Sequence, residues 1–158
     1  MIEQIEQAII ETGEILLHAE NIKDFTHTKD GAANFVTEYD TQVQKILFSK
    51  LSAILPEASF MGEEESAHTY TDKGYLFIID PIDGTTNFIK QNHTSCISAG
   101  LLKDGKPYLG IVYNPYRNEL FSAVAGKGAY LNHKPIHVSK EPLENSLLLF
   151  GSSPYYEE

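Results

Sequence analysis

The chain has 158 residues, of which 42% are hydrophobic and 11% aromatic, a composition that suits one globular domain with a proper core. Its 22 acidic residues outnumber its 12 Lys and Arg, and the formal charge of -10 argues against a general nucleic-acid binder. Since Cys96 is the only cysteine, Met1 opens no signal peptide and no apolar run has membrane-spanning length, we expect a cytoplasmic protein without disulfides or membrane association.

Two segments near the N-terminus carry apolar residues at the spacing of an amphipathic helix. The first helix is indicated by Ile2, Ile5, Ile9, Leu16 and Ala19. The second is predicted over about residues 37–55, where Pro56 ends a pattern formed by Val43, Ile46, Leu47, Leu51 and Ile54. We expect a loop over residues 23–34 between the two helices.

From residue 60 onward the apolar pattern changes to that of strands, with turn residues between them. The expected strands cover residues 75–79, 95–102, 108–113, 119–124 and 136–138. Asp104-Gly105 indicates a hairpin, and Gly126-Lys127-Gly128 a tight turn rather than a phosphate loop. Short links favour antiparallel pairing, so the predicted fold class is α+β, with two N-terminal helices packed on one face of an antiparallel sheet.

Residues 79–88 carry the strongest functional signal in the chain. Asp80 follows a hydrophobic strand, and Pro81 stiffens the turn, so that Asp80 and Asp83 can direct both carboxylates at one small volume. With the carbonyl of Ile82 between them, these hard oxygen donors suit Mg²⁺, which takes few protein carboxylates. The run therefore predicts a metal site at the end of a strand.

A phosphate site is expected directly beside this cation site. Gly84 lets the backbone come close to a ligand, and a helix that opens at Thr85 has free amides that favour an anion. The alternative is a simple turn, in which the second of two Asp residues caps a short helix without any ligand.

Two other acidic positions point to the same chemistry. Glu63 follows a strand end and is expected to share the cation with Asp80 and to orient an attacking water, supported by Glu64. The alternative is that the acidic cluster is a solvated loop or a helix start. Asp40 lies in the first turn of the second helix, where capping alone favours a carboxylate. We also expect Asp40 to accept a hydrogen bond from the Thr85 hydroxyl, which would position the water.

Asp40, the Glu63-Glu64 pair and the run from Asp80 to Thr85, in that order, resemble the inositol monophosphatase family of Mg²⁺-dependent, lithium-sensitive phosphatases. The resemblance implies the first domain of the inositol monophosphatase-like (sugar phosphatase) fold. It assigns residues 1–145 to an α+β metal-binding domain and residues 146–158 to the start of a C-terminal α/β domain that is otherwise absent. The family's downstream Trp-Asp pair, whose Asp completes the second metal site, has no counterpart in a chain without Trp.

The resemblance also implies roles for the acidic residues. One Mg²⁺ would be held by Glu63, Asp80 and the Ile82 carbonyl, and a second by Asp80 and Asp83. With one metal site incomplete, we expect the 158-residue chain to bind the second ion poorly and to turn over little substrate.

The phosphate is expected to bind at Asp83, Gly84 and Thr85, and a metal-activated water to hydrolyse it. The catalytic residues would be Glu63, Thr85 and Asp40. Glu64 and Lys29 would support them from outside the site, although a solvated loop lysine is the alternative for Lys29.

The substrate is expected to be inositol monophosphate or a related sugar or polyol phosphate, because the Asp80 run looks most like that branch of the family. The alternatives are 3′-phosphoadenosine 5′-phosphate, histidinol phosphate or fructose-1,6-bisphosphate. A truncated, non-catalytic binding module and a purely structural cation site are alternatives from other classes. Dimers are common in the family, so a homodimer is compatible with the resemblance.

Overall fold

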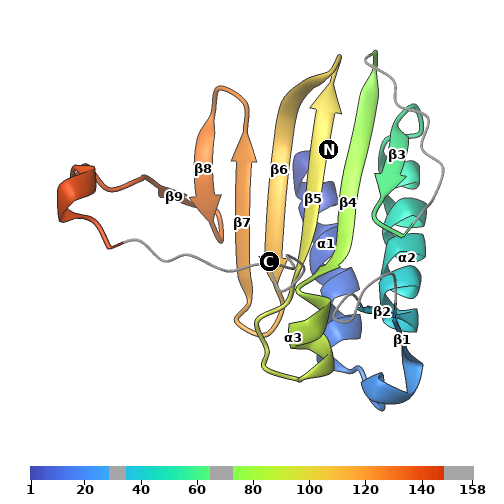
Figure 1. Cartoon of the computed structure of the whole chain (residues 1–158). Coiled ribbons are helices and arrows are strands. Elements are labelled where there is room, and N and C mark those ends of the chain that lie inside the picture. The colour runs from blue at the N-terminus through green and yellow to red at the C-terminus, as the bar shows by residue number, and fades with distance from the viewer. Residues whose placement is uncertain (29–34, 65–72, 148–158) are drawn as a thin grey trace, which may run out of the picture.

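The computed structural model describes residues 1–28, 35–64 and 73–147. Two helices, α1 (Ile2–Leu17) and α2 (Glu38–Ile54), pack on each other and cover one face of a seven-stranded sheet (Figure 1). Both predicted helices are confirmed. In the described ranges, no helix combines the length and the apolarity needed to cross a membrane.

The apolar stripes of the two helices form the core against the sheet. Ile5 and Ile9 on α1, and Leu47 and Leu51 on α2, are each 0% exposed. They pack with strand residues such as Phe77, so the core lies between the helix layer and the sheet.

The main sheet has the strand order β3-β4-β5-β6-β7-β8-β9. Its strands are β3 (Ser59–Gly62), β4 (Tyr75–Asp83), β5 (Cys96–Lys103), β6 (Lys106–Asn114), β7 (Glu119–Val124), β8 (Gly128–Leu131) and β9 (Lys134–Ile136). A small antiparallel sheet joins β1 (Thr26–Thr28) to β2 (Phe35–Thr37). The short helices are η1 (Ile22–Phe25), α3 (Thr85–Ile89) and η2 (Leu143–Asn145).

The main sheet is mixed, which corrects the prediction of a wholly antiparallel sheet. β3 runs parallel to β4, with Gly62 opposite Ile79, whereas the other neighbouring strands of this sheet are antiparallel. The connection over residues 63–74 is long enough for a parallel crossover, so the argument from short links does not apply to it.

Smaller differences concern single elements. Residues predicted to form a loop contain η1 and β1. The weak strand predicted over 136–138 lies earlier, as β9. β8 was not predicted, because none of its four residues is fully buried and it carries little apolar signal. The predicted second domain falls almost entirely outside the described residues.

The face of the sheet opposite the helices exposes apolar side chains. Along β6 and β7, buried and exposed residues alternate, so Leu109 and Ile111 face the helices while Val112 and Phe121, 40% and 39% exposed, face outward.

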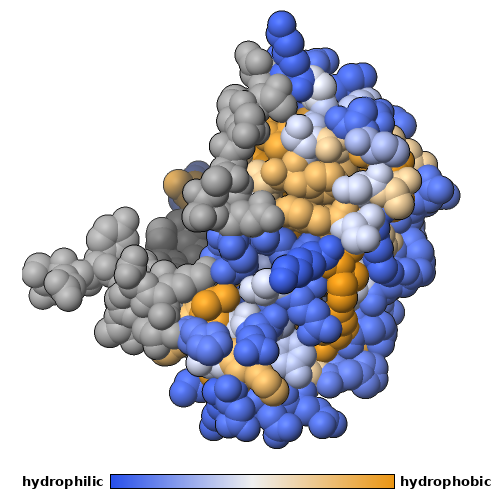
Figure 2. Space-filling model, turned by 90° about the vertical axis from the view of Figure 1, so that its right-hand side faces the viewer, coloured by the Kyte–Doolittle hydropathy of each residue, from blue (hydrophilic) through white to orange (hydrophobic). Residues whose placement is uncertain are grey.

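Viewed from the side of α2 and β3, the surface is largely hydrophilic with separate apolar patches (Figure 2).

Candidate active site

The acidic run lies at the end of β4, where the strand becomes irregular. β4 continues to Asp83, beyond the predicted end at Ile79, but its pairing with β5 shifts register between Asp80 and Asp83. Pro81 lies in this interval and has no amide hydrogen to donate to a neighbouring strand. The irregular interval therefore lies between the two carboxylates, at the end of the strand.

Gly84 turns the chain from β4 into α3. Its φ of +86° lies in the left-handed region, which glycine adopts without strain. Its carbonyl accepts a hydrogen bond from the Phe88 amide at 3.0 Å, so a short helix begins at Thr85, as the sequence predicted.

The Thr85 hydroxyl links α3 to α2 and to the end of β4. Its Oγ1 lies 3.2 Å from Asp40 Oδ1 and 3.1 Å from the Ile82 carbonyl oxygen, and it can donate its single proton to either. The predicted hydrogen bond between Thr85 and Asp40 is therefore present. What it does in catalysis stays a prediction.

Asp40 is both a helix cap and a partner of Thr85. The carboxylate is 1% exposed, and its Oδ2 accepts bonds from the Thr37 amide at 2.7 Å and the Thr37 hydroxyl at 2.6 Å. Burial raises the pKa of Asp40, although the bonds from Thr37 oppose this. The capping and positioning interpretations are thus compatible, because each uses a different carboxylate oxygen.

Parallel pairing brings Glu63 beside Asp80. Gly62 is opposite Ile79, and the Glu63 amide donates to the Ile79 carbonyl at 3.1 Å, so the next residue on each strand is an acid. Burial, then the charge and hydrogen bond of Glu63, then the charge of Asp83 raise the pKa of Asp80 to about 7. Carboxylates held this close repel one another, and a bound cation would relieve that repulsion.

These groups line a common pocket of about 290 Å³. Its lining residues are Phe35, Glu63, Asp80, Ile82, Asp83, Gly84, Thr85, Thr86 and Asn87. Six predicted site residues are among them, whereas Phe35, Thr86 and Asn87 were not predicted as site residues. Lys29, predicted at the mouth of the site, lies outside the described residues.

Glu64 does not line the pocket. Its amide donates a hydrogen bond to Gln44, and its charge is close enough to raise the pKa of Asp40.

The donor set of this pocket fits a hard divalent cation. Across residues 1–28, 35–64 and 73–147, no three His, Cys, Asp or Glu side chains are close enough together to hold a metal ion by themselves. Mg²⁺ does not require such a cage, since it is usually held by one or two carboxylates and keeps several waters. Glu63 and Asp80, with the Ile82 carbonyl and Asp83 on the same wall, could supply the protein ligands.

Cys96 is next to the site, which sequence reasoning missed. It is opposite Asp83 in the β4–β5 pairing, and its Sγ lies 3.8 Å from Asp83 Oδ2. Burial, then the charges of Asp83 and Asp80, raise the pKa of the thiol to about 11, so it stays neutral near pH 7. Only the strand register reveals this contact, and no sequence signal marks it.

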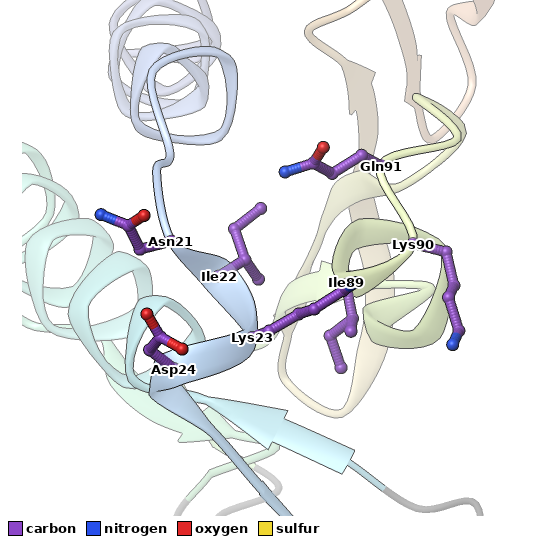
Figure 3. A pocket seen from close by; sticks show the side chains of 7 residues that line it. All are labelled: Asn21, Ile22, Lys23, Asp24, Ile89, Lys90 and Gln91. Atoms are coloured by element: carbon purple, nitrogen blue, oxygen red, sulfur yellow. The ribbon is translucent and has the colours of Figure 1, made fainter.

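A second pocket, of about 400 Å³, lies between η1 and α3 and holds none of the predicted site residues. Figure 3 shows Gln91 extending toward Ile22 on η1, while Lys90 points away from it. The other residues that line this second pocket are Asn21, Lys23, Asp24 and Ile89.

Comparison with known proteins agrees with this geometry. The model of the inositol monophosphatase family matches residues 1–157. The chain belongs to this family. Inositol monophosphatase 2 of Saccharomyces cerevisiae is 46% identical over 117 residues, which are 73% of this chain and 40% of that protein. The chain spans about half the length of the relatives it matches.

Several solved structures share the fold of the chain. The extragenic suppressor protein suhB of Bartonella henselae has a TM-score of 0.80 at 33% identity, over 89% of this chain and 55% of that one. SaIMPase-II, solved with inositol monophosphate bound, has a TM-score of 0.73 at 27% identity, over 90% of this chain and 51% of that one. Other matches were solved with NADP and Ca²⁺, or as an inhibitory complex soaked in LiCl. The α+β fold class is thereby confirmed.

Proposed function

We propose that the chain is the metal-binding portion of a Mg²⁺-dependent phosphatase that hydrolyses a phosphate monoester. The observation that carries this proposal is the pair Glu63 and Asp80, held side by side in a pocket that Gly84 and Thr85 also line. Two carboxylates with an unfavourable mutual charge, next to backbone amides that can bind an anion, suit a cation that bridges protein and phosphate.

The metal ligands in this proposal are Glu63, Asp80, the Ile82 carbonyl and Asp83. When bound, Mg²⁺ supplies positive charge that activates water and offsets the charge of the phosphate. Asp80 must lose its proton to serve as a ligand, so metal binding should release protons below about pH 7.

The remaining residues position the reactants. The Thr85 hydroxyl, held by Asp40, is placed to orient the attacking water, and Glu63 is placed to accept its proton. Amides of Gly84 and Thr85 would bind phosphate oxygens, with Asp83 facing the same space. Residues 1–145 would form this metal-binding unit.

The substrate we propose is inositol monophosphate or a related sugar or polyol phosphate. Support comes from SaIMPase-II, which was solved with inositol monophosphate bound. The described pocket has groups for a phosphate and a cation but few that would select a leaving group. The alternatives are 3′-phosphoadenosine 5′-phosphate, histidinol phosphate and fructose-1,6-bisphosphate.

Mn²⁺ binding, followed by electron paramagnetic resonance, tests the metal site without requiring turnover. The wild-type chain should bind Mn²⁺, with Mg²⁺ competing, and Asp80→Asn should weaken binding by about 100-fold, since it removes a ligand and a charge. Glu57→Gln, an exposed carboxylate after α2, is the matched control. Equal binding by Asp80→Asn and wild type would contradict the site.

Phosphate release tests the reaction. With Mg²⁺ and inositol monophosphate, we expect slow turnover that EDTA and Asp83→Asn abolish and that lithium inhibits. The other three phosphate esters, assayed in parallel, rank the substrates. If Mn²⁺ binds but no ester is hydrolysed even when a longer natural product is assayed, a structural cation site or a binding module is the better description.

A further inference from the structure

A buried glutamine on α2 contacts the turn that carries Glu63. Gln44 is 4% exposed, and its Oε1 accepts a hydrogen bond from the Glu64 amide at 3.1 Å. Because an amide hydrogen must meet an acceptor, this bond fixes which end of the Gln44 side chain faces the turn.

Gly62 makes room for this contact. A Cβ placed on Gly62 would overlap Oε1 and Cδ of Gln44 and would lie 2.7 Å from Nε2. The side chain of Gln44 thus occupies the volume that any other residue at position 62 would fill. The backbone conformation of Gly62 itself is ordinary extended strand, so space and not a positive φ explains this glycine.

The turn is therefore held from two sides. On the strand side, the Glu63 amide donates to the Ile79 carbonyl, which precedes Asp80. On the helix side, the Glu64 amide donates to Gln44. Two consecutive amides bonded to two different elements leave the backbone at Glu63 little freedom to rotate.

Gln44 also lies one helical turn after Asp40, and residues at this spacing share a face of a helix. Asp40 Oδ1 lies 3.2 Å from the Thr85 hydroxyl, and Gln44 accepts a hydrogen bond from the Glu63-Glu64 turn. Both side chains are buried on α2, which packs against β4 and whose Phe48 ring lies 4.9 Å from the ring of Phe60 on β3; the two strands lie beside this helix in Figure 1.

We propose that Gln44 is a positioning residue for the metal site, which fixes the Glu63-Glu64 turn so that Glu63 lies against Asp80. Together with Asp40 it makes α2 the rigid element that sets the distance between Thr85 and the Glu63-Glu64 turn. This inference rests on the proposed function, since it assigns Gln44 a role only if Glu63 is a metal ligand.

Mn²⁺ affinity and stability, measured on the same variants of the full chain, test the proposal. Gln44→Met keeps the shape but removes the acceptor, and the Kd for Mn²⁺ should rise about tenfold, as for other residues that orient metal ligands. Gln44→Glu keeps an acceptor for the Glu64 amide but adds a buried charge, so it should destabilise the fold while retaining affinity within about threefold of wild type. Gln42→Met, an exposed position on the same helix, should change neither quantity.

Gly62→Ala provides a second route if Gln44→Met fails to fold. The added methyl group should displace the Gln44 amide and raise the Kd for Mn²⁺ by a similar factor. In the double variant Gly62→Ala/Gln44→Ala, the alanine at position 62 no longer meets a glutamine side chain. The double variant should therefore bind Mn²⁺ no more weakly than Gln44→Ala alone. If the two substitutions raise the Kd for Mn²⁺ additively, the proposed contact is contradicted.

Three outcomes separate this inference from the proposed function. If the wild type binds no Mn²⁺, the metal site itself is wrong and the role of Gln44 is refuted with it. If the wild type binds Mn²⁺ and Gln44→Met binds it equally well, the role of Gln44 is wrong and the metal site stands. If the Kd simply follows the free energy of unfolding across all variants, Gln44 is a structural residue and not a positioning one.

Discussion

Replacing Asp80 by Asn should stabilise the metal-free chain near neutral pH. Burial, with Glu63 and Asp83 adding to it, raises the pKa of Asp80 from its ordinary 3.8 to about 7. At a pH between 3.8 and about 7, Asp80 carries a proton in the folded chain but not in the unfolded chain. The contribution of Asp80 to stability is therefore present at low pH and is lost as the pH rises to about 7. Asn has a similar shape and does not titrate, so the variant does not lose stability in this way as the pH rises.

The magnitude follows from the pKa change and the exposure of the group. A rise of this size corresponds to about 4 kcal/mol for a carboxyl fully shielded from water. Asp80 is only partly buried, and solvent screening reduces the effect, so we expect Asp80→Asn to raise the free energy of unfolding by roughly 1–2 kcal/mol at pH 8. For a chain of this length, that corresponds to roughly 3–6 °C in Tm.

Urea unfolding followed by circular dichroism, with EDTA present, measures this effect at pH 5 and pH 8. The advantage of Asp80→Asn should be larger at pH 8 than at pH 5 and should level off above pH 7. Mg²⁺ should then stabilise the wild type but not the variant. A variant that is less stable than wild type at pH 8, or whose advantage is the same at both pH values, would refute the reasoning.

Three further predictions use the same chain. Asp40→Ala should lower the free energy of unfolding by about 2–3 kcal/mol in urea, because it leaves the buried Thr37 amide and hydroxyl without their acceptor; no change would contradict the capping role. Gly84→Ala should lower the free energy of unfolding by about 1–2 kcal/mol, because alanine is strained at a φ of +86°. Gly100→Ala should lower it less, since the added Cβ meets only the Ile78 carbonyl, at 3.9 Å. The reverse order would argue against backbone strain at Gly84. Cys96, with a pKa raised to about 11, should react slowly with iodoacetamide at pH 8 in EDTA, at a rate that still rises above pH 9, and alkylation as fast as that of free cysteine would exclude the raised pKa.

The sequence predicted the elements that depend on local pattern. Apolar spacing located α1 and α2, and the hydrophobic run before Asp80 located β4. The hydrogen bond between Thr85 and Asp40 was also predicted, although 45 positions separate the two residues.

What the sequence could not predict depends on strand register and direction. The sequence predicted that Glu63 would share a cation with Asp80, but not the parallel pairing of β3 with β4 that brings them together, because a four-residue strand does not indicate its direction. The contact of Cys96 with Asp83 likewise follows from register. Gln44 has no signal of its own, since a polar residue on a helix is ordinarily expected to be exposed.

Because Asp40 contacts both Thr37 and Thr85, its placement can be followed by nuclear magnetic resonance. Its Oδ2 caps α2 by accepting the Thr37 amide at 2.7 Å, while its Oδ1 faces the Thr85 hydroxyl. The exchange rate of the Thr37 amide proton therefore reports whether Asp40 is in place. One nuclear magnetic resonance signal can thus follow when Asp40 reaches its position beside Thr85 during folding, before a metal ion or a phosphate is added.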